Sequence, residues 1–244
     1  MKEAPKEIPP EMRDQFLMNG KMKLLDQYIN QASEDVQQDL VDDHYTPSNF
    51  DKLLEKASGR TPNHYGMTDL YLWASLEKLL KPGDKVLIIG STIPWYEAML
   101  YDLGCKDITV AEFGPRPDFK EGIRYVHPDD LKGEYDICIS ISTHEHTGLG
   151  RYGDPLDPDG DIKAIEELRK SVKRNGYLLL AVPVGQDTLV WNAHRIYGKN
   201  RLQKLIGSWA LHGVVGFDTS HMDIDRGIDG SHQPVFALYN EDTN

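Results

Sequence analysis

The chain has 244 residues, enough for one large domain or a domain with an appendage, and 39 acidic residues against 27 basic ones give a formal net charge of −12. So acidic a surface repels phosphate backbones, which argues against nucleic acid as a partner. The apolar runs stop at about eight residues, too short to span a membrane, the first residues lack the apolar core of a secretory signal, and two cysteines give no disulfide framework, so we expect a soluble cytoplasmic protein.

The first 64 residues are polar and are predicted to form a helical extension, while residues 65–244 are predicted to form the main domain. Apolar side chains at helical spacing predict a helix over Glu11–Ala32, which a central glycine either bends or divides in two. Residue 48 or 49 is expected to cap a further helix that runs to Ala57. The main domain opens with a helix over Thr68–Leu80.

From residue 85 onward, short apolar runs alternate with helical segments. The runs predict parallel strands at Lys85–Gly90, Asp107–Phe113, Gly122–Val126, Tyr135–Ile141 and Tyr177–Val184. The helices are expected at Trp95–Leu103, at Asp161–Lys173 with Asp161 as its cap, and near Arg201–Leu211. Because the strands are apolar throughout, they predict an α/β fold with a doubly wound, mostly parallel, Rossmann-like sheet. The last two runs predict an antiparallel edge hairpin of Val214–Asp218 and Pro234–Tyr239.

One polar loop, residues 142–161, follows the strand at Tyr135–Ile141 and holds two histidines, a glutamate, an arginine and four aspartates. A connection of this length inside a compact domain is typical of a functional loop, although an ordinary turn cluster is the alternative. His144 and His146 would share one side of an extended loop, and His194 would enter the same cleft. One of these three is predicted to be a general base, because imidazole titrates near neutral pH. The alternative is that each only hydrogen-bonds the loop backbone.

Residues at the ends of three successive strands suit a nucleotide-like ligand. Gly90 ends the first strand, where a glycine lets a ligand approach the backbone closely. Glu112 ends the second strand about twenty residues later, the spacing at which an acid accepts hydrogen bonds from ribose hydroxyls. Asp129 follows the third strand, where a carboxylate could meet an adenine amine. The Gly-x-Gly-x-x-Gly pattern is incomplete after Gly90, which argues against a dinucleotide, and an ordinary strand-to-helix turn is the alternative.

Carboxylates beside the histidines offer a second chemistry. The loop carries Asp154 and three further aspartates close to Glu145. Oxygen ligands, with one imidazole, could bind Mg²⁺, Mn²⁺ or Ca²⁺, and we expect Glu145 and Asp154 as the ligands. The competing interpretation is that the aspartates only shape turns and cap the following helix.

The order of elements, with its closing hairpin, resembles the class I S-adenosylmethionine-dependent methyltransferase fold. Four stretches are similar to a family of domains of unknown function that is related to these methyltransferases and occurs in nematodes and in surface-glycan gene clusters. They are Ile89–Ser91, Glu145–Asp154, Val182–Gly185 and Asn192–Tyr197. The similarity extends over residues 65–215. It implies S-adenosylmethionine as cofactor and places Gly90, Glu112 and Asp129 in the cofactor pocket, to which we add the strand-end serines Ser91 and Ser142.

We therefore predict an S-adenosylmethionine-dependent O-methyltransferase that acts on a hydroxyl of a small molecule, sugar or glycan. The residues expected to bind the acceptor are Arg151, Tyr152, Asp154, Asn192 and Arg195. One alternative is a metal-dependent hydrolase or isomerase that uses the loop with His144, Glu145 and His146. The other is a non-catalytic methyltransferase-like binding domain. The sequence specifies neither the acceptor nor the oligomeric state.

Overall fold

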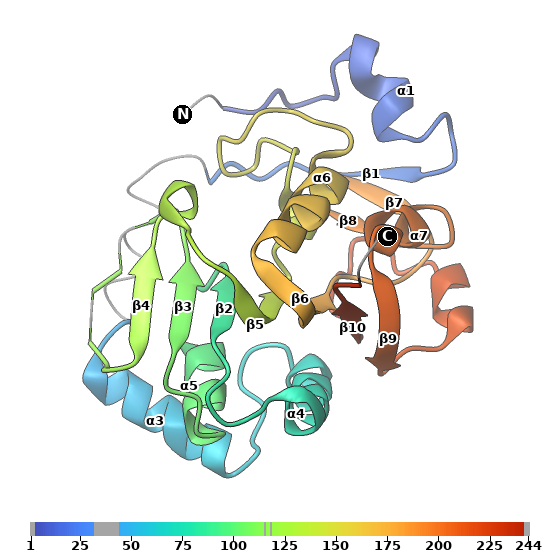
Figure 1. Ribbon diagram of the computed structural model, residues 1–244. Coiled ribbons are helices and arrows are strands. Elements are labelled where there is room, and N and C mark those ends of the chain that lie inside the picture. The colour runs from blue at the N-terminus through green and yellow to red at the C-terminus, as the bar shows by residue number, and fades with distance from the viewer. Residues whose placement is uncertain (1–2, 32–43, 115, 118, 242–244) are drawn as a thin grey trace.

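The computed structural model describes residues 3–31, 44–114, 116–117 and 119–241, and its centre is a seven-stranded sheet (Figure 1). The strand order is β4-β3-β2-β5-β6-β10-β9. The strands are β2 (Val86–Ile89), β3 (Ile108–Ala111), β4 (Ile123–Val126), β5 (Tyr135–Ile141), β6 (Val172–Ala181), β9 (Ala210–Val215) and β10 (Val235–Tyr239). The first five are mutually parallel, and β10 pairs antiparallel with both β6 and β9. The predicted doubly wound sheet and its antiparallel edge are confirmed.

Helices cover both faces of this sheet, as continuous apolar strands require. On one face, α3 (Pro47–Ser58), α4 (Met67–Leu79) and α5 (Trp95–Asp102) pack on a core that includes Val86 and Ile88. On the other face, α6 (Gly160–Glu167) and α7 (Arg201–Ile206) pack on a core that includes Leu87. Neighbouring residues of β2 thus contribute to opposite cores. No helix within the described ranges is long and apolar enough to cross a membrane.

Several helix ends differ from the sequence prediction. Thr46, rather than residue 48 or 49, caps α3, and its side chain accepts the backbone N–H of Asn49. The helix expected to reach Lys173 ends at Glu167, where a 3₁₀ turn, η4 (Leu168–Lys170), leads directly into β6. Its predicted cap is also wrong, because the carboxylate of Asp161 is buried in an ion pair with Arg201. The helix α7, which was expected to reach Leu211, ends at Ile206, and the residues from Ala210 belong to β9.

The N-terminal segment contains a strand where a helix was expected. A 3₁₀ turn, η1 (Pro10–Met12), and a short helix, α1 (Arg13–Phe16), precede β1 (Lys23–Gln27). The predicted helix over Glu11–Ala32 is therefore wrong beyond Phe16, and Ala32 lies outside the described residues. Three consecutive residues with positive φ end the helix: Met18, Asn19 and Gly20. The boundary predicted between residues 64 and 65 stays a prediction.

A second, three-stranded sheet in the order β1-β7-β8 was not predicted. Here β1 runs parallel to β7 (Thr188–Asn192), which pairs antiparallel with β8 (His194–Ile196) (Figure 1). One side of this sheet packs on a small apolar cluster in which Phe16 meets Trp191 edge to face, with ring centroids 5.3 Å apart. The first strand of the chain is thus joined to the segment that follows β6. That segment and the loop after β5 flank the carboxyl ends of the parallel strands.

Candidate functional site

The loops that follow β2 and β5 touch at the carboxyl edge of the sheet. Gly90 has a φ of +74°, and a Cβ there would lie 3.1 Å from the side chain of Thr143. Thr143 in turn donates from Oγ1 to the carbonyl oxygen of Ile89 at 3.1 Å. The close approach that requires glycine is therefore made by the neighbouring loop. It fixes the loop after β2 beside the predicted catalytic loop.

Glu112 at the end of β3 holds the loop after β2. Its Oε2 accepts the backbone N–H of Ser91 at 2.9 Å, and its Oε1 accepts that of Phe113 at 2.8 Å. Arg116 lies 3.5 Å from the same carboxylate and donates to the carbonyl oxygen of Ser91. Gly90, Ser91 and Glu112 are thus brought together as predicted. Asp129 follows β4, in the 3₁₀ turn η2 (Pro128–Asp130), with a side chain 87% exposed.

A second carboxyl group at this loop was not predicted. Glu97 of α5 is completely buried, and its Oε1 accepts the hydroxyl of Ser91 at 2.8 Å. Its Oε2 has no hydrogen-bond partner within the described part of the chain. Burial raises the pKa of Glu97 to about 7. The only sequence signal is a glutamate within the apolar run of this helix, Trp95–Leu100.

Glu145 forms the centre of the loop after β5. Its side chain is 1% exposed, and its Oε1 accepts the hydroxyl of Ser142 at 2.6 Å. Nε2 of Gln233, just before β10, donates to Ser142 Oγ at 3.0 Å. Oε2 of Glu145 has no partner among the residues that the structure describes. Burial raises the pKa of Glu145 to about 7, although the hydrogen bond from Ser142 opposes the shift.

His146 and His194 lie beside Glu145. Nδ1 of His146 is 2.6 Å from the carbonyl oxygen of Ala193, which can only accept, so Nδ1 carries the proton and the Arg151 nitrogen 3.2 Å away is only a close neighbour. Nε2 of His146 then faces Oε1 of Glu145 at 3.7 Å. The rings of His146 and His194 are 6.3 Å apart. Burial, with the nearby charge of Arg151, lowers the pKa of His146 to about 3 and that of His194 to about 4.

His144 is separated from the other two histidines. Residues 144–146 form a 3₁₀ turn, η3 (His144–His146), rather than an extended chain, and residues two apart in such a turn point to different sides. The expected shared side of His144 and His146 is therefore wrong. Burial lowers the pKa of His144 to about 4, and the carboxylate that opposes this shift is Asp161.

Three of the residues predicted to bind the acceptor are used by the polypeptide itself. Asn192 is fully buried and accepts the backbone N–H of Ile29 at 2.8 Å. Arg195 donates to the carbonyl oxygen of Thr147 at 2.7 Å. Asp154 accepts the backbone N–H of Gly148 at 2.6 Å. The Arg195 contact ties the loop after β5 to β8, the Asn192 contact ties β7 to the residues after β1, and the Asp154 contact lies within the loop.

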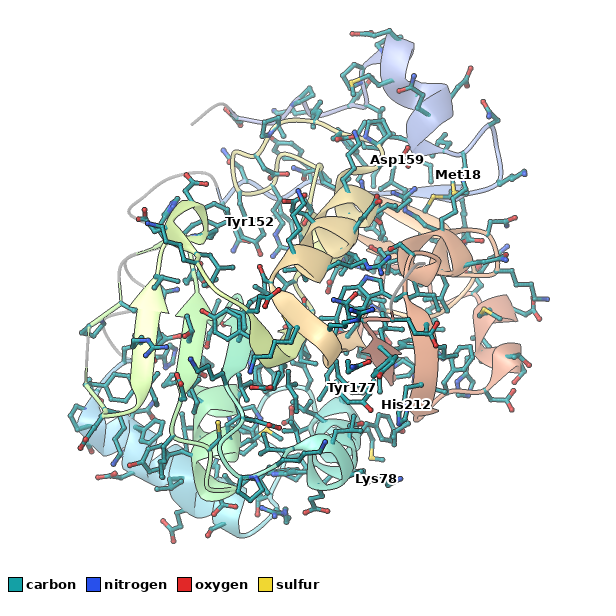
Figure 2. All side chains as sticks on the ribbon, in the orientation of Figure 1. Met18, Lys78, Tyr152, Asp159, Tyr177 and His212 are labelled. Carbon is teal, nitrogen blue, oxygen red and sulfur yellow. The ribbon has the colours of Figure 1, made fainter. Side chains whose placement is uncertain are left out.

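The other two acceptor candidates border the cluster around Glu145. Nε of Arg151 donates to the side chain of Gln31 at 2.7 Å, while its NH1 reaches the carbonyl oxygen of Ala193. Tyr152 is 38% exposed, with its ring centroid 5.8 Å from that of His146. Figure 2 shows Tyr152 on the loop beyond the carboxyl ends of the parallel strands.

The two predicted metal ligands do not share a site. Within the described ranges, no group of three or more histidine, cysteine, aspartate or glutamate side chains is placed to hold a metal ion. Glu145 is bound to Ser142, and Asp154 is bound to the loop backbone.

Comparison with solved structures identifies the fold. The N-methyltransferase NodS from Bradyrhizobium japonicum WM9, in complex with S-adenosyl-L-homocysteine, matches 87% of this chain and 100% of its own with a TM-score of 0.52 and 13% identity. A 1,6-didemethyltoxoflavin-N1-methyltransferase from Burkholderia thailandensis matches 99% of this chain and 94% of its own with a TM-score of 0.48 and 13% identity. The chain therefore has the fold of class I methyltransferases.

Sequence comparison gives the family. A search of curated protein sequences finds no match to this chain. The profile of the family described as "Caenorhabditis protein of unknown function, DUF268" matches residues 83–225, more than half of the chain and the part that runs from β2 past β9. With that match and the methyltransferase fold, this chain belongs to the DUF268 family.

Proposed function

We propose that this protein transfers a methyl group from S-adenosylmethionine to a hydroxyl group, with a sugar or glycan as the acceptor. The proposal rests on the position of Glu145. It is a buried carboxyl group at the carboxyl edge of the parallel sheet, held through one oxygen, with the other oxygen unpartnered among the described residues. In doubly wound sheets, ligands bind beyond this edge.

The residues at the ends of β2 and β3 fit the cofactor. Each oxygen of Glu112 accepts one backbone N–H, and a carboxylate oxygen can accept a second hydrogen bond, which leaves room for ribose hydroxyls. Glu97 adds a buried oxygen beside Ser91 that has no hydrogen-bond partner among the described residues, and Arg116 balances part of the charge of Glu112 and Glu97. Gly90, Ser91 and Glu112 would hold the cofactor, with Ser142 and Asp129 at its margins. When bound, S-adenosylmethionine supplies the methyl group.

The chemistry left to the protein is the removal of one proton. Oε2 of Glu145 would take the hydroxyl proton as the acceptor oxygen bonds to the methyl carbon, and the bond from that carbon to the sulfonium sulfur would break, so that S-adenosylhomocysteine leaves. A general base works best when its pKa lies near the working pH, and the pKa of Glu145, raised by burial to about 7, meets this condition. Ser142 fixes Oε1, so that Oε2 is the free oxygen. We assign the base to Glu145 because the low pKa values of His146 and His194 leave both rings weak as bases.

Calorimetric titration with S-adenosylmethionine tests the cofactor assignment. We expect Glu112→Ala to weaken binding by about 1–3 kcal/mol, the range for removing the partner of a buried polar group. Glu121→Ala, an exposed glutamate before β4, is the matched control and should bind as the wild type does. Absence of binding by the wild-type protein would overturn methyl transfer. Equal binding by a folded Glu112→Ala variant would move the cofactor elsewhere.

A further inference from the structure

A hydrogen-bonded chain of fixed direction runs through the candidate site. Nε2 of Gln233 donates to the carbonyl oxygen of Gly230 at 3.0 Å, which identifies it as the amide nitrogen because a carbonyl can only accept. The same nitrogen donates to Ser142 Oγ at 3.0 Å. The single hydroxyl proton of Ser142 is then given to Glu145 Oε1. The donors of Gln233 Nε2 and Ser142 are all used inside the protein, and the hydroxyl of Tyr65 also lies against Ser142.

At each end of this hydrogen-bonded chain, one acceptor oxygen has no hydrogen-bond partner among the described residues. Oε1 of Gln233 and Oε2 of Glu145 are buried, and neither has a hydrogen-bond partner among the residues that the structure describes. Leaving a buried polar atom unpaired is costly, so two such atoms on either side of one serine indicate a ligand that supplies two donors. Gln233 is 3% exposed, and it was not among the residues predicted from the sequence.

The surrounding charge selects the kind of donor. Arg151 lowers the pKa of both His146 and His194, which shows that its positive charge is felt across the site. Arg151 and Arg195 also lower the pKa of Glu145, so two guanidinium groups already balance the negative charge of this carboxylate, and a protonated amine would add a further positive charge. Hydroxyl groups donate hydrogen bonds without a charge. The site therefore favours an uncharged ligand with two hydroxyls.

We infer that Gln233 is a specificity-determining residue that binds a second hydroxyl of the acceptor, so that the site takes a diol. One hydroxyl lies at Oε2 of Glu145 and is the one methylated, and its neighbour donates to Oε1 of Gln233. This inference rests on the proposed function for the identity of the reacting hydroxyl. The binding of the diol itself does not depend on methyl transfer.

Ligand-observed NMR with cis-1,2-cyclohexanediol, cyclohexanol and 2-aminocyclohexanol tests the subsite on the full chain. We expect the diol to bind the wild-type protein about tenfold more tightly than cyclohexanol, as one added hydrogen bond allows. The ammonium compound should bind more weakly than the diol. Equal binding of diol and cyclohexanol, or tightest binding of the amine, would overturn the inference.

Variants then locate the second hydroxyl. Gln233→Leu should reduce binding of the diol to that of cyclohexanol. Gln186→Leu, an exposed glutamine, is the matched control and should keep the preference for the diol. A folded Gln233→Leu variant that keeps this preference would also overturn the inference. If the diol binds but S-adenosylmethionine does not, the proposed function fails and the subsite stands; the reverse result removes the subsite and leaves methyl transfer.

Discussion

Glu97 is a buried carboxyl group whose ionisation opposes folding. Its pKa is about 7 in the folded protein because of burial, against an ordinary value of 4.5. The folded state therefore holds a proton that the unfolded state loses as pH rises from about 4.5 to about 7, and stability falls across this window. Above pH 7 the loss is complete.

Glu97→Gln removes this pH-dependent loss of stability and keeps a side-chain oxygen that can accept the hydroxyl of Ser91. We expect the variant to gain up to about 3 kcal/mol of unfolding free energy at pH 8 and little at pH 4, since one pKa unit corresponds to about 1.4 kcal/mol. Urea unfolding at the two pH values measures the difference. An equal change at both values would mean that the carboxyl group does not titrate in this range.

Glu145→Gln tests the proposed base. On an acceptor that the wild-type protein methylates, we expect turnover to fall by about 10²–10⁴-fold, with the affinity for S-adenosylmethionine retained. Wild-type turnover should rise with pH through about 7 and then level, because Glu145 must be ionised to take the proton. Glu166→Gln, an exposed glutamate on α6, should keep full turnover. Loss of turnover in a His146 variant with none in Glu145→Gln would return the base to histidine.

A buried ionic cluster around Asp161 and Arg201 stabilises the end of the loop between β5 and α6. The guanidinium of Arg201 is fully buried, pairs with Asp161 and donates to the carbonyl oxygen of Pro158 at 2.6 Å. Tyr197 donates to the same carboxylate at 2.9 Å, and Arg195 lies 3.8 Å from it. The two arginines lower the pKa of Asp161 despite its burial. Buried hydrogen bonds and ion pairs therefore fix the conformation of the polar loop at this end.

Arg201→Met should destabilise the protein by about 3–5 kcal/mol, because it leaves a buried carboxylate short of its main partner. Adding Asp161→Asn should restore part of this loss, so the double variant should be more stable than the sum of the single effects predicts. Chemical unfolding of the four proteins at pH 7 gives the coupling. Additive effects would show that the two side chains do not act as a pair.

The parallel strands could be predicted from the sequence, whereas the second sheet could not. Strands such as Tyr135–Ile141 are buried on both faces, so each is apolar throughout and legible by itself. The strand β1 has exposed and half-buried positions, and its identity comes from pairing with residues far along the chain. Local spacing carries no signal for that pairing, so the apolar spacing of this segment predicted a helix instead of a strand.

The candidate site was predicted as a region but not in detail. The sequence located the loop that holds Glu145 and the acid at the end of β3. The sequence did not identify Glu97 and Gln233 as site residues, because each is placed in the site by a hydrogen bond to a residue of another element. It also assigned Asn192 to the acceptor, since a polar residue that satisfies buried backbone looks the same in sequence as one that binds a ligand.

At the scale of the whole molecule, the beginning of the chain stabilises the segment after β6. Phe16 is 1% exposed and packs against Trp191 of β7. Phe16→Ala should lower the free energy of unfolding by about 3–5 kcal/mol and speed amide exchange in β7 more than in β2. Phe113→Ala, at a phenylalanine that is 69% exposed, should change stability by less than about 0.5 kcal/mol. Uniform acceleration of exchange would show that the two sheets open together.

The pairing of Lys23 with Thr188 also bears on the order in which parts of the fold can form. During synthesis β1 is made before β7, and the five parallel strands of the main sheet are made between the two. Contacts so distant in sequence form late, because a long loop must close before they stabilise anything. His194 and Gln233 follow β7 in the chain. A chain synthesised only as far as β6 therefore lacks His194 and Gln233, which border the proposed acceptor site.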